Sequence, residues 1–204
     1  MPGASGWPEY VGWLGNAFYF TRFLIQWIHS ERAGKTVAPT LFWWFSVCGA
    51  AALGFYAYWT RNTPLLLGYT ITFVIYVRNL TIVHLGARAG RLGLLPALGI
   101  ALAAAAVLIY LAAGKEVEAS IHRAWIVVGF VGQAVFSSRF VVQWYATERR
   151  GEAHFPRSFW WLSLVGNVLL LAYVIRCGDL VFIAGFFLGP FVQIRNLMLS
   201  RTKR

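Results

Sequence analysis

Charge is scarce in this chain, and acidic charge is scarcer still. Only 12% of the 204 residues are charged, with seven aspartates and glutamates against 18 lysines and arginines. Soluble domains carry about 25% charged residues, so this composition excludes an ordinary soluble fold. Hydrophobic residues make up 59% of the chain and gather in runs of about twenty residues. The composition therefore predicts an all-α integral membrane protein.

Residues that hold metals or perform catalysis are also few. The two cysteines, Cys48 and Cys177, lie in or beside apolar runs, and the four histidines show no metal-ligand spacing. No nucleophile motif is present, and most of the acids fall in loops or tails. We therefore expect no disulfide, metal or cofactor and no catalytic residue, and we predict that the chain is not an enzyme.

Hydrophobic runs predict seven transmembrane helices and a sidedness. Most lysines and arginines fall in loops that would face the cytoplasm if the N-terminus is periplasmic and the C-terminus cytoplasmic. We predict a multi-pass protein of the bacterial inner membrane, and we attribute the net charge of +11 to topology and lipid contacts rather than to nucleic acid. The expected helices cover 9–28, 41–59, 64–84, 94–113, 122–145, 157–176 and 179–199.

An internal repeat organises these helices. The stretch RFLIQWIHSERAGKT, which begins at Arg22, returns as RFVVQWYATERRGEA at Arg139, and the match continues without a gap to Leu80 and Leu197. Shared Arg, Gln, Glu and Asn at a single offset of 117 residues indicate a duplication. Pro39 and its repeat-mate Pro156 suit helix starts after loops.

Each copy of the repeat holds three helices, and an extra helix lies between the copies. Because three is odd, that extra helix is needed to give both copies the same orientation. This predicts a 3+1+3 architecture with two parallel triple-helix repeats, which is a known plan among transporters. The expected divisions are 1–85 for the first repeat, 86–120 for the linker helix and 121–204 for the second repeat.

Arginines within apolar segments are the main candidates for function. A charged side chain at bilayer depth costs roughly 2.5–3.5 kcal/mol on insertion scales, so its presence needs a reason. One reason is snorkelling to the headgroups, and another is an ion pair of Arg22 with Glu31 or Glu148. A third is a cationic pocket for a phosphate-bearing headgroup. The predicted headgroup-binding residues are Arg22, Arg139, Arg78, Arg195, Gln26, Gln143, Asn79 and Asn196.

Other polar and aromatic groups of the segments form a supporting or gating set. Such groups commonly make hydrogen bonds between membrane helices, and they also suit the lining of a polar path. Gly189-Pro190 predicts a kink in the last segment. The supporting residues are Glu31, Glu148, Trp27, Trp144, Asn16, Gln133, Asn167, Tyr56 and Tyr173.

One motif set resembles the lipid-A biosynthesis N-terminal domain family. It consists of R-F-x-x-Q-W-x-x-[ST]-E-R-x-G, followed by Pro, F-W-W-x-S and R-N-L. Here the pattern occurs twice and covers nearly all of the chain. The three-helix unit is more distantly similar to PQ-loop and SWEET-type transporters, although the proline-glutamine dipeptide is absent. The first resemblance implies a role in envelope glycolipid metabolism.

These observations lead to a functional prediction in three versions. The first is a transporter, or flippase, that moves a polyprenyl-phosphate-linked sugar across the inner membrane for lipid A or envelope glycan modification. The alternatives are a SWEET-like uniporter for a small solute and a non-transporting membrane partner of a glycosyltransferase. In the first version, the expected partner is a membrane lipid such as undecaprenyl phosphate carrying a sugar, and a monomer suffices because one chain holds both repeats.

Overall fold

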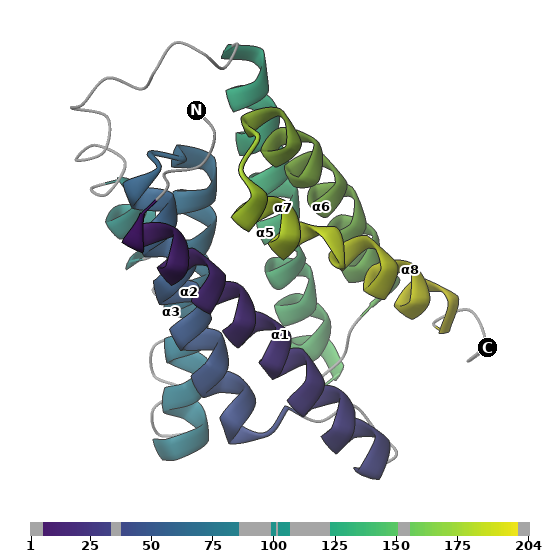
Figure 1. Ribbon diagram of the computed structural model, residues 1–204. Helices are drawn as coiled ribbons and strands as arrows, with labels where there is room; N and C mark the ends of the chain where they lie inside the picture. Colours follow the sequence, from purple (N-terminus) through teal and green to yellow (C-terminus); the bar gives the residue numbers. More distant parts are fainter. Residues whose placement is uncertain are drawn as a thin grey trace. The chain divides into compact units, whose positions relative to one another are not determined.

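The computed structural model is all-helical and describes residues 6–33, 38–85, 99–100, 102–106, 123–150 and 156–199. The chain divides into two compact units, which we call the first unit (Ala4–Val117) and the second unit (Glu118–Arg204). Figure 1 labels the helices of both units. They are α1 (Trp7–Ala33), α2 (Thr40–Trp59) and α3 (Thr63–Leu85), then α5 (Arg123–Arg150), α6 (Arg157–Cys177), α7 (Leu180–Phe187) and α8 (Gly189–Leu199).

Five segments of the described chain are long and apolar enough to cross a membrane. At 1.5 Å per residue, a segment of about twenty residues spans the roughly 30 Å hydrocarbon core. The expected 9–28 segment is part of the longer helix α1, which is not among the five, and the expected 94–113 segment lies mostly outside the described residues. The seven-span 3+1+3 arrangement therefore stays a prediction. The five segments are Thr40–Trp59, Thr63–Leu85, Ala124–Gln143, Arg157–Cys177 and Leu180–Met198.

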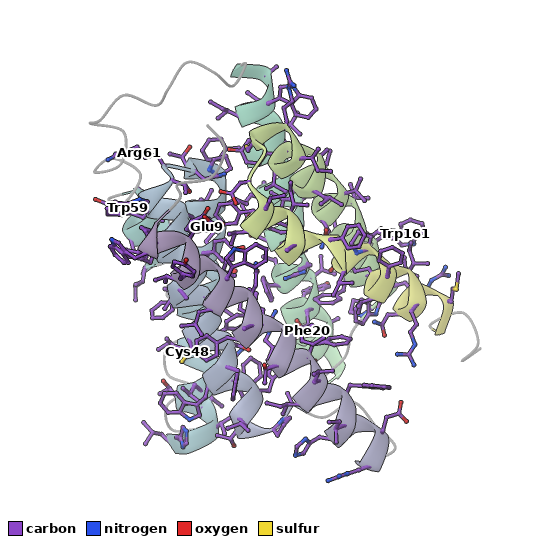
Figure 2. The ribbon with its side chains drawn as sticks, viewed as in Figure 1. Glu9, Phe20, Cys48, Trp59, Arg61 and Trp161 are labelled. Carbon is purple, nitrogen blue, oxygen red and sulfur yellow. The ribbon has the colours of Figure 1, made fainter. Side chains whose placement is uncertain are left out.

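Side chains are distributed as expected for a protein surrounded by lipid. Large apolar residues such as Trp59, Trp161 and Phe20 are about half exposed, and many apolar side chains point outward from the helices (Figure 2). Polar side chains, including Ser46 and Ser163, are buried among the helices instead. Because lipid solvates apolar surface and not polar groups, this arrangement supports the membrane assignment.

Both units are built around a central helix, and their packing follows the sequence repeat. Helix α2 packs against α1 and α3, and α6 packs against α5, α7 and α8. In the first unit, Gly49 of α2 lies directly against the ring of Tyr19. In the second unit, the equivalent Gly166 lies against the backbone of Phe136, where an added Cβ would come within 2.6 Å of the Phe136 nitrogen. The duplication therefore includes the close approach of the first two helices.

Helix starts repeat in the same way. Pro39 precedes α2 with φ −67° and ψ 160°, and Pro156 precedes α6 with φ −69° and ψ 159°, which confirms the predicted starts. The third helix of each unit is capped by a side-chain oxygen: Asn62 accepts from the Leu65 N–H at 3.3 Å, and Asp179 accepts from the Val181 N–H at 3.0 Å. The amide and the carboxylate therefore perform the same task at equivalent positions.

The third helix of the second unit is broken, whereas α3 of the first unit is continuous. Helix α7 ends at Phe187 and α8 begins at Gly189, and Figure 1 draws them as two successive helices. Pro190 has no N–H to donate, so the ordinary helical hydrogen bond to the Phe186 carbonyl cannot form. The kink predicted at Gly189-Pro190 is thus confirmed.

Candidate functional site

Arg22 lies between the three helices of the first unit. Its Nη1 donates to the Tyr76 hydroxyl of α3 at 2.7 Å and to Ser46 Oγ of α2 at 3.2 Å. Ser46 Oγ in turn donates to the Phe42 carbonyl at 2.6 Å, so its lone pairs face the arginine. The guanidinium carbon also lies 4.0 Å from the centre of the Tyr19 ring. Hydroxyls and ring faces thus hold the guanidinium in one orientation.

The contacts of Arg22 bear on one of its sequence-based explanations. The side chain is half-buried, and its hydrogen bonds run to hydroxyls of its own unit. In the described part of the chain no carboxylate pairs with it, and Glu31 instead accepts from Trp27 Nε1 at 3.1 Å. A pair with Glu31 is therefore not formed, the side chain of Glu148 lies outside the described residues, and snorkelling and the headgroup pocket stay predictions.

The guanidinium keeps hydrogen-bonding capacity on one edge. An arginine has five N–H donors in a planar fork, and two of them belong to Nη1. Nε and Nη2 hold the other three, and among the described residues none accepts a hydrogen bond from them. The Nε–Nη2 edge has the geometry that binds a phosphate or carboxylate with two parallel hydrogen bonds.

Arg139 occupies the equivalent position in the second unit, in different surroundings. It is half-buried, and its guanidinium carbon lies 3.5 Å from the centre of the Phe136 ring and 4.7 Å from that of Phe140. Phe159 lies at 5.9 Å, much as its equivalent Phe42 lies 5.6 Å from the guanidinium carbon of Arg22. The ring of Phe136 replaces the hydroxyl-bearing ring of Tyr19, so the two arginines share one ring contact and differ at another.

The remaining predicted headgroup ligands are placed less centrally. Arg78 follows Tyr76 by two residues on α3, about 200° around the helix, so it lies on a different face from the side chain that binds Arg22. Arg195 of α8 is exposed, and Asn196 donates to the Val192 carbonyl of its own helix at 2.8 Å. Because the four arginines are divided between two units, their convergence in one pocket stays a prediction. Gln26, Gln143 and Asn79 are half-buried.

Supporting residues fall into three groups. Gln133, Asn167, Tyr56 and Tyr173 are each buried, and Asn16 is half-buried. Gln133 Nε2 donates to Ser137 Oγ at 2.9 Å. Trp27 and Glu31 are exposed and are hydrogen-bonded to each other. The side chains of Trp144 and Glu148 lie outside the described part of the structure. In the residues that are described, no cluster of metal-ligating side chains occurs.

Two partners of Arg22 were not predicted: Tyr19 and Tyr76. The prediction rested on residues that recur in both copies, and Tyr76 has no tyrosine at its equivalent position, which is Gln193. A usable signal existed for Tyr19, since it lies three residues before Arg22 and therefore on the same helix face.

Comparison with known proteins identifies the family. The model of the lipid A biosynthesis N-terminal domain matches residues 11–81 and again residues 128–198. The two matches are separated by the same 117 residues as the repeat, and together they cover most of the chain. The chain belongs to this family and carries the domain twice. No solved structure matches, so the likeness to PQ-loop and SWEET-type transporters stays a prediction.

Similar curated proteins are named lipid-A-disaccharide synthase. That of Chlamydia trachomatis serovar D is 30% identical over 95% of this chain and 34% of its own length. That of Chlamydia pneumoniae is 32% identical over 93% of this chain and 33% of its own length. That of Chlamydia muridarum is 28% identical over 95% of this chain and 34% of its own length. The chain thus spans about a third of the length of these relatives.

These relatives correct two predictions. A transporter or flippase is wrong as the function, because the similar proteins are named as an enzyme of lipid A synthesis, and the prediction that the chain is not an enzyme conflicts with the same names. The uniporter and partner alternatives are not better supported. The physical reason is that a helical-bundle plan does not determine chemistry, so architecture was a poor basis for inferring transport.

Proposed function

We propose that the chain forms the membrane-embedded part of lipid-A-disaccharide synthesis and holds a lipid-bearing saccharide by an anionic group. The observation that carries this proposal is the fixed orientation of Arg22. Tyr76 and Ser46 occupy Nη1, while the Nε–Nη2 edge of the same group has no acceptor among the described residues. A bidentate phosphate on that edge would offset a charge that is costly at this depth.

The family and the relatives supply the chemical context of the ligand. Lipid A is a lipid, and a disaccharide synthase joins two sugars, so substrate and product of such an enzyme remain associated with the membrane. A half-buried arginine inside a helical unit surrounded by lipid suits the anionic group of such a molecule. The ligand predicted from the sequence, a polyprenyl-phosphate sugar, also carries an anionic phosphate. The experiment below distinguishes it from a lipid A precursor by its mass.

The test is native mass spectrometry of the full chain purified gently from bacterial membranes. We expect a bound acylated saccharide phosphate in the wild-type protein, and about tenfold less in Arg22→Lys, which keeps the charge but loses the planar fork. Arg157→Lys is the matched control, because Arg157 is an exposed arginine at the start of α6. A bound polyprenyl phosphate would support the anion site but would show that its ligand is not a lipid A precursor. Equal binding of bulk phospholipid by all three proteins would contradict the proposal.

A further inference from the structure

The second unit differs from the first at the positions that surround the arginine. Tyr76, which accepts the 2.7 Å hydrogen bond from Arg22, is replaced by Gln193, while Ser46 is retained as Ser163. Ser163 Oγ donates to its own helix at 2.6 Å, as Ser46 does. The second unit therefore keeps the framework of the first but presents a carboxamide where the first presents a phenol.

Two carboxamides of the second unit are buried with an oxygen that has no partner. Gln193 of α8 is 6% exposed and Asn167 of α6 is 4% exposed. Within the described residues, neither Gln193 Oε1 nor Asn167 Oδ1 accepts a hydrogen bond. A buried acceptor left unsatisfied costs free energy, and native proteins contain few of them. Two in one small unit indicate that a donor beyond the described residues belongs there.

The break between α7 and α8 brings these two residues to the same region. Asn167 lies directly against Gly189, where an added Cβ would come within 2.8 Å of Asn167 Cγ. Gly189 and Gln193 are one turn apart on the same face of α8. Both α7 and α8 pack on α6, and Gln193 follows the contact between Gly189 and Asn167 by one turn. The two carboxamides are thus about one helical turn apart on the packed pair of helices α6 and α8.

The three-helix unit does not need these two carboxamides in order to fold. In the first unit, Ala50 stands at the position of Asn167 and Tyr76 at the position of Gln193, while Thr72-Phe73 stands at the position of Gly189-Pro190 within the continuous helix α3. Ala50 is 1% exposed, so the first unit fills the place of Asn167 with an apolar side chain. The pair of carboxamides is therefore specific to the second unit, where it carries a cost that packing alone does not explain.

We propose that Asn167 and Gln193 form a saccharide-binding site, in which Oδ1 and Oε1 accept hydrogen bonds from sugar hydroxyls. A hydroxyl both donates and accepts, so a carboxamide, which does the same, is its natural partner. The inference deepens the proposed function and rests on it for the identity of the lipid, because the saccharide is the part of that lipid that carries hydroxyl groups.

The experiment separates sugar recognition from anion recognition with two lipids. The full chain, purified without sugar-based detergents, is placed in phosphatidylcholine nanodiscs with glucosyl-diacylglycerol, which is an uncharged glycolipid, and phosphatidic acid, which is an anion without a sugar. Native mass spectrometry then counts each bound lipid. The variants are Asn167→Leu and Gln193→Met, with Ser138→Ala as the control, since Ser138 is a half-buried polar residue of the same unit whose hydroxyl donates to the Val135 carbonyl of its own helix.

We expect Asn167→Leu and Gln193→Met each to lower glucosyl-diacylglycerol binding about tenfold and to leave phosphatidic acid unchanged. Ser138→Ala should change neither. Arg22→Lys should lower phosphatidic acid only, so a failure of the anion site and a failure of the sugar site give different results. If a variant does not fold, Gln193→Tyr restores the residue of the first unit and is expected to fold and to lose the glycolipid.

The contradicting outcome is specific. If Asn167→Leu, Gln193→Met and Gln193→Tyr all bind glucosyl-diacylglycerol as the wild type does, the amide oxygens do not recognise a sugar. That result overturns the sugar site.

Discussion

Arg22 Nη1 and the hydroxyl of Tyr76 are 2.7 Å apart, and this hydrogen bond joins α1 to α3 across the first unit. Both helices pack on α2, and α2 contributes Ser46 to the same guanidinium. One arginine thus connects all three helices through hydroxyl groups. The same contact leaves the Nε–Nη2 edge oriented for an anion, so the stability of the unit and its proposed binding function depend on one side chain.

Removing the Tyr76 hydroxyl tests this connection. Tyr76→Phe keeps the ring but removes the acceptor of a charged donor, which we expect to lower the free energy of unfolding by about 1–3 kcal/mol. Thermal unfolding in a mild detergent is the measurement. Tyr10→Phe is the control, because Tyr10 is 76% exposed. A Tyr76→Phe protein as stable as the control would show that the hydrogen bond does not hold the helices together.

The helices were largely predictable because membrane-spanning segments can be recognised in the sequence as long runs of apolar residues. The predicted 41–59 and 64–84 match α2 (Thr40–Trp59) and α3 (Thr63–Leu85) to within a residue. Proline marked the starts of α2 and α6, and Gly189-Pro190 marked the break in the last segment. Helix α1 extends beyond the predicted 9–28 on both sides, because the helix continues into polar residues such as His29, Glu31 and Arg32, which an apolar run does not include.

The candidate site was predictable only in part. Arg22 and Arg139 were found because a charge in an apolar run is costly, but their partners were not. Tyr76 and Gln193 were not predicted as site residues, because the prediction rested on residues shared by the two copies and these two equivalent positions differ. Contacts between helices depend on side-chain direction in three dimensions, which spacing along one helix does not provide.

Glycine at the helix crossing of the second unit gives a further prediction. A methyl group at Gly166 would lie 2.6 Å from the backbone nitrogen of Phe136, and a backbone cannot rotate away as a side chain can. We expect Gly166→Ala to lower the free energy of unfolding by about 1–3 kcal/mol. Gly54→Ala is the matched control, since its methyl would meet only Tyr69 Cβ at 3.4 Å. Equal thermal midpoints for the two variants would contradict the observed crossing.

The Asp179 cap of α7 can be tested by replacing it with asparagine, the residue that caps α3 in the first unit. Asp179 accepts from the N–H groups of Val181 at 3.0 Å and Phe182 at 3.3 Å. Asp179→Ala should cost about 0.5–2 kcal/mol in chemical denaturation, while Asp179→Asn should keep most of the stability because Asn62 caps α3 in the same way. If the asparagine variant is as unstable as the alanine variant, the carboxylate charge rather than the cap is what α7 requires.

The central claim is that Arg22 holds the anionic group of a lipid used in lipid-A-disaccharide synthesis, and it is tested most directly in cells that depend on this chain. The measurement is the ratio of acylated disaccharide to acylated monosaccharide in extracted membrane lipids, compared between wild type, Arg22→Lys and the control Arg157→Lys. We predict a ratio about tenfold lower in Arg22→Lys and unchanged in the control, with equal amounts of protein in the membrane. An unchanged ratio in Arg22→Lys would contradict the account.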